Sequence, residues 1–213
     1  MKRIVPAAGL IAAALFAPGP AAAQVFGQLT SAEILPLNGH VAGFYLNASD
    51  NTLGGLAQLR MSLYPGIDFG FQGGLQRVSW QGSDRTTLRL GGDLRVAIAH
   101  SGEGFPFDIA AGGALGVETS DDYHVLTLMP SGVMSRSFGV GQNGSIAPYL
   151  GLGFSFANVD AGPVRQTFLS LPLRLGADFR VMPGMSLSAE LQIPIGDGFN
   201  DGFGVMTGVN LPF

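Results

Sequence analysis

The acidic residues near one histidine are the side chains of this sequence that suit hydrolytic chemistry best. Asp121, Asp122 and His124 lie within four positions, and a carboxylate beside an imidazole could activate water. A solvated polar loop explains the same three residues, and no serine lies in a nucleophile-elbow pattern. We therefore expect no catalytic residues, and a hydrolase or lipid-modifying enzyme at this rim remains an alternative.

Metal and cofactor chemistry finds little support in the residue types. The sequence has no cysteine, which excludes disulfides and thiolate metal sites. The stretch DGFNDG (197–202) partly resembles a calcium loop, but Phe199 stands where an oxygen ligand is required. We expect no metal site and no cofactor, although weak divalent-cation contact at an acidic rim stays open.

Strict alternation of apolar and polar residues predicts the elements that would position these side chains. In the stretch TLRLGGDLRVAIA (87–99), the residues Leu88, Leu90 and Leu94 share one parity, while Arg89 and Arg95 share the other. A strand turns successive side chains to opposite faces, so one face is apolar and the other is charged. Helical periodicity is nearly absent after residue 36, and we expect one all-β domain.

Segments of this kind recur about every 17 residues, separated by turn residues. Ten strands are expected, with eight as the alternative count, joined as an antiparallel up-and-down meander. They span 38–47, 55–64, 68–80, 87–99, 106–118, 123–134, 146–157, 166–181, 185–195 and 203–213.

The glycines on the polar face indicate which face points inward. Glycine weakens a solvent-facing strand and has no reason to recur there. Inside a narrow barrel, small residues leave room for arginines that need acidic partners. The apolar face would then meet lipid, where a charge costs about 2–4 kcal/mol at the midplane. The pattern therefore predicts a closed transmembrane β-barrel with its leucines outside.

This orientation predicts a network of paired charges in the lumen. Arg95 is expected near Asp108, and Arg174 diagonal to Glu190. A slip in parity suggests a bulge near Gln76 and Arg77, which keeps Arg77 inside. The predicted network consists of Arg60, Arg77, Arg89, Asp93, Arg95, Asp108, Glu118, Arg174, Asp178, Arg180 and Glu190.

The first 23 residues have the layout of a secretory signal peptide: a basic start at Lys2 and Arg3, an apolar run, and an A-x-A site ending at Ala23. Residues 24–37 form an N-terminal extension that could be a short tail, a plug or an extra strand, and 38–213 form the barrel. The mature chain holds nine arginines and 15 acidic residues. A nucleic-acid partner is therefore not expected, because phosphate binding needs clustered positive charge.

The signal peptide, the alternating strands and the ending GVMTGVNLPF resemble bacterial outer-membrane β-barrel proteins of the small porin-like, OmpA- or OmpX-like kind. In that family the last strand ends in an aromatic residue with apolar residues at alternate positions. Val205, Val209, Leu211 and Phe213 match this pattern, whereas Thr207 and Pro212 depart from it. The resemblance implies recognition by the barrel-assembly machinery and contact with outer-membrane lipid and lipopolysaccharide.

These patterns favour a non-enzymatic outer-membrane barrel with a structural or surface-contact role. Barrels of eight to ten strands have interiors that side chains just fill, so a packed lumen is favoured. A narrow passive channel for small solutes is the second hypothesis.

Overall fold

The computed structural model describes residues 30–80, 83–102, 104–141, 144–162, 164–195 and 203–213. The predicted signal peptide, the start of the extension and the DGFNDG stretch lie outside this part of the chain. The strands are β1 (His40–Ser49), β2 (Thr52–Tyr64), β3 (Ile67–Trp80), β4 (Ser83–Ala99), β5 (Asp108–Ser120), β6 (Tyr123–Ser135), β7 (Phe138–Val140), β8 (Gly144–Gly153), β9 (Ser155–Ala161), β10 (Val164–Met182), β11 (Met185–Ile195) and β12 (Gly204–Pro212).

These strands form one closed antiparallel barrel, in which neighbouring crossings are hydrogen-bonded and β12 pairs with β1. β8 and β9 make a single crossing, interrupted at Phe154, because both pair with β6 on one side and β10 on the other. β7 is a three-residue strand on the margin of β8. The barrel thus has ten crossings, which confirms the predicted count over the alternative of eight. The described residues contain no helix long and apolar enough to cross a membrane.

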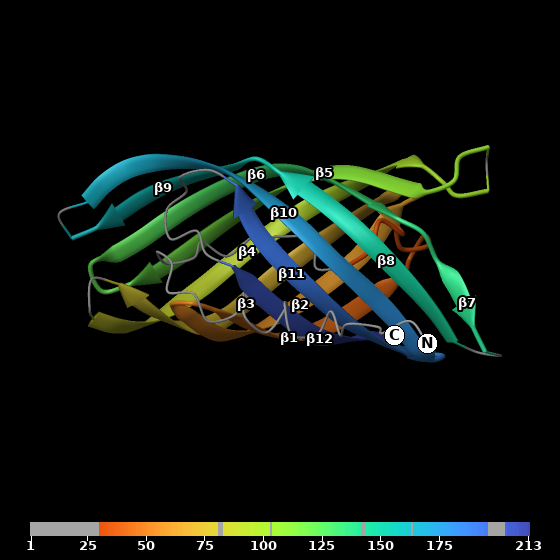
Figure 1. Ribbon diagram of the computed structural model, residues 1–213, viewed down its shortest axis with the longest axis horizontal. Helices are drawn as coiled ribbons and strands as arrows, with labels where there is room; N and C mark the ends of the chain where they lie inside the picture. The colour runs from red at the N-terminus through yellow and green to blue at the C-terminus, as the bar shows by residue number, and fades with distance from the viewer. Residues whose placement is uncertain (1–29, 81–82, 103, 142–143, 163, 196–202) are drawn as a thin grey trace, which may run out of the picture.

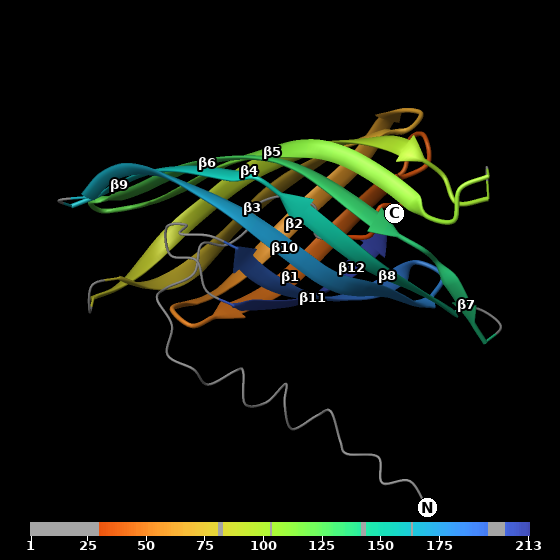
Figure 2. The ribbon, with the colours of Figure 1, turned by 45° about the horizontal axis from the view of Figure 1, so that its top comes forward.

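The strands are tilted around the barrel, with the β9–β10 hairpin at one end and β7 at the other (Figures 1 and 2). We call the end that holds β7, Thr30 and Phe213 the proximal end, and the end that holds the β9–β10 hairpin the distal end. The turns between β2 and β3 and between β10 and β11 are proximal, and each contains a glycine with positive φ, Gly66 at 74° and Gly184 at 87°. Only glycine adopts this conformation without steric cost.

The apolar parity of the strands faces outward. Leu88, Leu90 and Leu94 are 42%, 53% and 40% exposed, whereas Arg89 and Arg95, on the other parity, are each 1% exposed. The same alternation runs through β6, where buried and exposed residues follow one another from Tyr123 to Pro130. Closure leaves no free sheet edge, so the backbone groups of the strands are paired and the outer face of the barrel can contact hydrocarbon. The polar side chains then turn inward. The predicted inside-out arrangement is confirmed.

Glycines on the inner face lie where large side chains cross the lumen. A Cβ on Gly208 would overlap the ring of Tyr45 from the neighbouring strand, and one on Gly176 would overlap the ring of Tyr149. A Cβ on Gly151 would lie 2.8 Å from a guanidinium nitrogen of Arg174. Gly208, Gly176 and Gly151 therefore leave space for tyrosine and arginine side chains.

The bulge expected near Gln76 and Arg77 is absent. The register between β2 and β3 runs without a shift from Thr52 opposite Val78 to Met61 opposite Phe69. Val78 is 1% exposed and faces the lumen in the same parity as Gln76. The sequence pattern misleads at this point because an inward valine has the same apolar character as a lipid-facing one.

The glycine spaces yield a stability prediction. Gly208→Val should lower the free energy of unfolding by about 1–3 kcal/mol, because the added side chain overpacks against Tyr45. The measurement is the urea midpoint of barrel refolding into liposomes. Gly139→Val in β7 is the matched control, since a Cβ there meets nothing within 4 Å. Equal midpoints for the two variants would contradict the packing role of Gly208.

Candidate functional site: the charged lumen

A four-residue charge cluster carried by β2, β3 and β4 lies inside the lumen toward its proximal end. Arg60 contacts Asp68 and Asp93, each at 2.5 Å, through its two terminal nitrogens. Arg95 binds the same carboxylate of Asp68 in a bidentate arrangement, with Nε to Oδ1 at 2.9 Å and Nη2 to Oδ2 at 2.6 Å. None of the four residues is more than 8% exposed. Two positive and two negative charges therefore neutralise one another away from solvent.

Two smaller polar groups extend the network around the wall. Glu190 lies 3.8 Å from Arg174 and accepts hydrogen bonds from Tyr149 Oη at 2.9 Å and Gln192 Nε2 at 2.7 Å. Arg89 stands opposite Glu118 in the β4–β5 register, and Glu118 also accepts a hydrogen bond from Thr87 Oγ1 at 3.0 Å. Arg174 and Arg89 are each 1% exposed.

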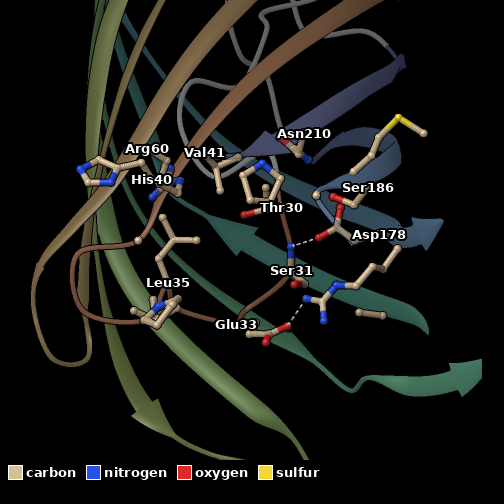
Figure 3. A pocket seen from close by; sticks show the side chains of 18 of the residues that line it. Thr30, Ser31, Glu33, Leu35, His40, Val41, Arg60, Asp178, Ser186 and Asn210 are labelled. Carbon is tan, nitrogen blue, oxygen red and sulfur yellow. Dashed lines mark hydrogen bonds and ion pairs between the residues drawn. The ribbon is translucent and has the colours of Figure 1, made fainter. Parts of the chain in front are cut away.

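The segment Thr30–Leu35 crosses the proximal end inside the barrel, bound through its main chain (Figure 3). Asp178 accepts a hydrogen bond from the Ser31 amide at 2.7 Å, and Asp68 accepts one from the Leu35 amide at 3.3 Å. Arg95 Nη1 donates to the Ser31 carbonyl at 2.7 Å. Of the options left open for the extension, the described part, from Thr30 onward, occupies the lumen as a plug would.

Side-chain packing adds to this hold. Ala32 is 2% exposed and packs with Ala110, Val133 and Tyr149 on the wall, with Ile34 alongside. The Ala32 amide donates to Ser135 Oγ at 3.0 Å. This packing supplements the hydrogen bonds to the segment Thr30–Leu35, among them the one from Arg95, which also pairs with Asp68.

The structure places the predicted network residues in two groups. Those that lie inside the barrel are Arg60, Arg89, Asp93, Arg95, Glu118, Arg174, Asp178 and Glu190. Arg77, Arg180 and Asp108 do not join these clusters.

Arg77 is a correction that follows from the missing bulge. Its side chain is 65% exposed on the outward face, where it pairs with Asp84 at the distal rim. Since the parity of β3 never slips, residue 77 falls on the outer face with Phe71 and Leu75.

Asp108 and Arg180 lie at the proximal end. Asp108 is half-buried and accepts hydrogen bonds from Ser101 N at 2.9 Å and Ser101 Oγ at 3.0 Å, so the expected pairing with Arg95 is wrong. Arg180 is 57% exposed and lies 3.8 Å from Glu33. Both residues come near strand ends, where the barrel no longer encloses the chain. The expected approach of Arg174 to Glu190 is present.

Sequence reasoning missed Asp68 and the lumen tyrosines. Asp68 is fully buried and shared by Arg60 and Arg95, yet it stands at the first residues of β3, beyond the clear alternation. Asp68 shares the inward parity of Gln72 and Gln76 in β3, and this parity was the sequence signal that could have identified it. Tyr45, Tyr123 and Tyr149 are each at most 4% exposed. Their aromatic character alone does not distinguish them from aromatic residues that face lipid.

The acid–histidine group at the distal rim is open to solvent. His124 faces outward, and its Nδ1 lies 2.7 Å from Thr119 Oγ1. Across the described residues, no group of three or more histidine, aspartate or glutamate side chains could hold a metal ion.

The last strand presents its apolar residues outward. Leu211 is 38% exposed and Phe213 75% exposed, and the Phe213 ring stacks on His40 with centroids 5.6 Å apart. Val205 and Val209 pair with Ala48 and Phe44 of β1. The role of these residues in assembly stays a prediction.

Comparison with known proteins finds no matching family model and no matching curated protein. Solved structures do match. A COG4313 outer membrane channel from Pseudomonas putida F1 aligns with a TM-score of 0.51 and 14% identity over 89% of this chain and 100% of that one. The β-domain of the Bordetella autotransporter BrkA aligns with a TM-score of 0.49 and 13% identity over 84% and 100%.

A bacterial polysaccharide outer membrane secretin aligns with a TM-score of 0.49 and 13% identity over 76% of this chain. The chain spans 57% of the length of that secretin chain. At these identities the likeness is one of fold, and the fold is that of bacterial outer-membrane β-barrels.

The shared carboxylate of Asp68 gives the sharpest stability prediction. Asp68→Asn should cost about 3–5 kcal/mol of unfolding free energy, because it leaves two buried guanidiniums without full compensation. The urea midpoint in liposomes measures this loss. Asp84→Asn breaks the exposed pair with Arg77 and should leave the midpoint unchanged. If both variants shift the midpoint equally, the buried cluster stabilises the barrel no more than a surface ion pair does.

Proposed function

We propose that this chain, an outer-membrane β-barrel by fold, is a non-enzymatic barrel with a closed, ion-paired lumen and a structural or surface-contact role. The observation that carries the proposal is the Arg60–Asp68–Arg95 cluster, which is buried inside the lumen and also binds the segment Thr30–Leu35. A solute path would have to break contacts that hold both the wall and the segment.

The surroundings of the barrel follow from its outer face. Exposed leucines and phenylalanines on every side suit contact with membrane lipid. We further propose that lipopolysaccharide contacts the distal rim and that the barrel-assembly machinery recognises β12 during insertion. The proposal for the assembly machinery rests on the resemblance in the last strand, and the proposal for lipopolysaccharide rests on the direction in which the strands run.

Conductance separates a closed barrel from a pore. The purified chain in planar lipid bilayers should show no steady single-channel conductance in 1 M salt, because the buried charges and the segment Thr30–Leu35 occupy the lumen. Reconstitution is checked by heat-modifiable gel mobility of the same sample. A reproducible open level would overturn the closed-lumen proposal.

A narrow channel is the second candidate, and one observation favours it. Both amide atoms of Asn47 and Oε1 of Gln76 are buried with no hydrogen-bond partner in the described part of the chain. Buried polar atoms without a protein partner are commonly hydrogen-bonded to water, which a hydrated path through the lumen would supply. The similar Pseudomonas putida protein is called a channel.

The variant Asn47→Phe tests the channel directly. If a conductance exists and follows this path, the bulkier ring should reduce it several-fold, whereas the outward Leu46→Phe should leave it unchanged. An unaltered conductance in Asn47→Phe would place any pore elsewhere.

The rim histidine tests the enzymatic alternative. Wild type and His124→Ala should hydrolyse phospholipid and peptide substrates at the same background rate, because His124 is exposed and its Nδ1 contacts the Thr119 hydroxyl. Folding of the variant is verified by its heat-modifiable mobility. Activity that is present in wild type and lost in His124→Ala would contradict the proposal.

A further inference from the structure

The wall of the proximal lumen recognises the segment Thr30–Leu35 mainly through its peptide groups (Figure 3). Three amides of the segment donate to wall side chains: Ser31 N to Asp178 at 2.7 Å, Ala32 N to Ser135 at 3.0 Å and Leu35 N to Asp68 at 3.3 Å. Two carbonyls, of Ser31 and Glu33, accept from Arg95 at 2.7 and 3.4 Å. Every peptide carries such groups, so this part of the recognition is independent of residue type.

Two side chains of the segment add selectivity. Ala32 is 2% exposed and lies against three wall residues, which are Ala110, Val133 and Tyr149. A larger side chain at this position would overpack against them. The carboxylate of the next residue, Glu33, lies 3.8 Å from the Arg180 guanidinium at the mouth. The wall therefore suits a small residue followed by an acidic one.

The other side of the segment borders open space. A cavity of about 350 Å³ lies between the segment and the wall made by β1, β2 and β10–β12. Thr30, Ser31, Glu33, Ile34 and Leu35 all line this cavity, whereas Ala32 faces the packed side. The segment adds no strand to the sheet, which closes through the pairing of β12 with β1. An occupant held on one side only can leave without opening the barrel.

Each charged side chain that holds the segment also has a partner in the wall. Arg95 is paired with Asp68, and Asp68 is paired with Arg60 as well. Asp178 accepts a hydrogen bond from Ser188 Oγ at 2.6 Å. Departure of the segment therefore leaves none of these charges uncompensated, and the vacated site keeps its shape for another peptide.

We propose that the proximal lumen is a binding site for an extended peptide, that residues 30–35 are its resident occupant, and that a similar segment of another chain can replace them. The ligand has a small side chain at the position of Ala32 and a carboxylate at the next position. It enters from the proximal end, along the cavity. The proposal goes beyond the structural or surface-contact role and does not depend on whether the lumen conducts, because binding is measured without a current.

A peptide supplied in trans tests the site in the full chain, held in phosphatidylcholine nanodiscs. The probe is the fluorescein-labelled, amidated peptide TSAEIL, which copies residues 30–35. Ala32→Phe should displace the resident segment by overpacking, whereas Glu33→Phe adds the same ring at a side chain that is 59% exposed. By fluorescence anisotropy, the peptide should bind Ala32→Phe at least 10-fold more tightly than wild type or Glu33→Phe. In these two proteins the tethered segment competes at high effective concentration.

Peptides with one ester bond test the recognition of the main chain. An ester oxygen in place of the Ala32 nitrogen removes the donor to Ser135 and should weaken binding to Ala32→Phe roughly 3- to 10-fold. An ester at Ile34 is the control, because the Ile34 amide has no hydrogen-bond partner among the described residues. Adding Ser135→Ala should remove the difference between the amide and the Ala32 ester. Adding Ser145→Ala, at a serine of the cavity wall, should preserve it.

A second displacing variant, Ala32→Asp, places a carboxylate against the same wall residues and should bind the peptide as Ala32→Phe does. Folding of each variant is verified by heat-modifiable gel mobility. The proposal is overturned if both displacing variants fail to fold, since the segment is then part of the fold. It is also overturned if the peptide binds all the proteins alike or none of them, or if the amide and the Ala32 ester bind equally.

Discussion

A single carboxylate between two buried guanidiniums holds the interior of this barrel together. Asp68 binds Arg60 on one side and Arg95 on the other, and all three residues are at most 2% exposed. Buried charges are tolerated only when they are paired and hydrogen-bonded. The packing of the β2–β4 wall and the position of the crossing segment both follow from satisfying these groups.

The same cluster joins the N-terminal segment to the wall. Since Arg95 and Asp68 bind the main chain of Ser31 and Leu35, the segment is held by its backbone more than by its side chains. Asp178, on the opposite wall, accepts the Ser31 amide. The segment divides the proximal lumen into a packed side against β5 and β6 and an open side, which is the cavity lined by Gln58 and Arg60.

The architecture could be predicted from alternation alone, because residues such as Leu90 and Arg89 must lie on opposite faces of a strand. The site was predictable only in part. Arg174 and Glu190 were found because a tight turn fixes their register. The pairing of Arg95 with Asp68 was missed, since a long side chain can reach either neighbouring strand. Arg77 was misplaced because Val78, an inward apolar residue, broke the expected pattern. The path of residues 30–36 follows from contacts far apart in the chain, which no local pattern reports.

The direct test of the inside-out arrangement uses spin labels, which the cysteine-free chain accepts at single introduced cysteines. Leu90 and Leu128, both 53% exposed on the wall, are compared with Asp121 at the distal turn, with the barrel in lipid vesicles. Collision with oxygen, which concentrates in hydrocarbon, and with a water-soluble nickel complex is measured at each site. The account predicts high oxygen and low nickel accessibility at Leu90 and Leu128, and the reverse at Asp121. High nickel accessibility at the two leucines would show that this face meets water and would contradict the account.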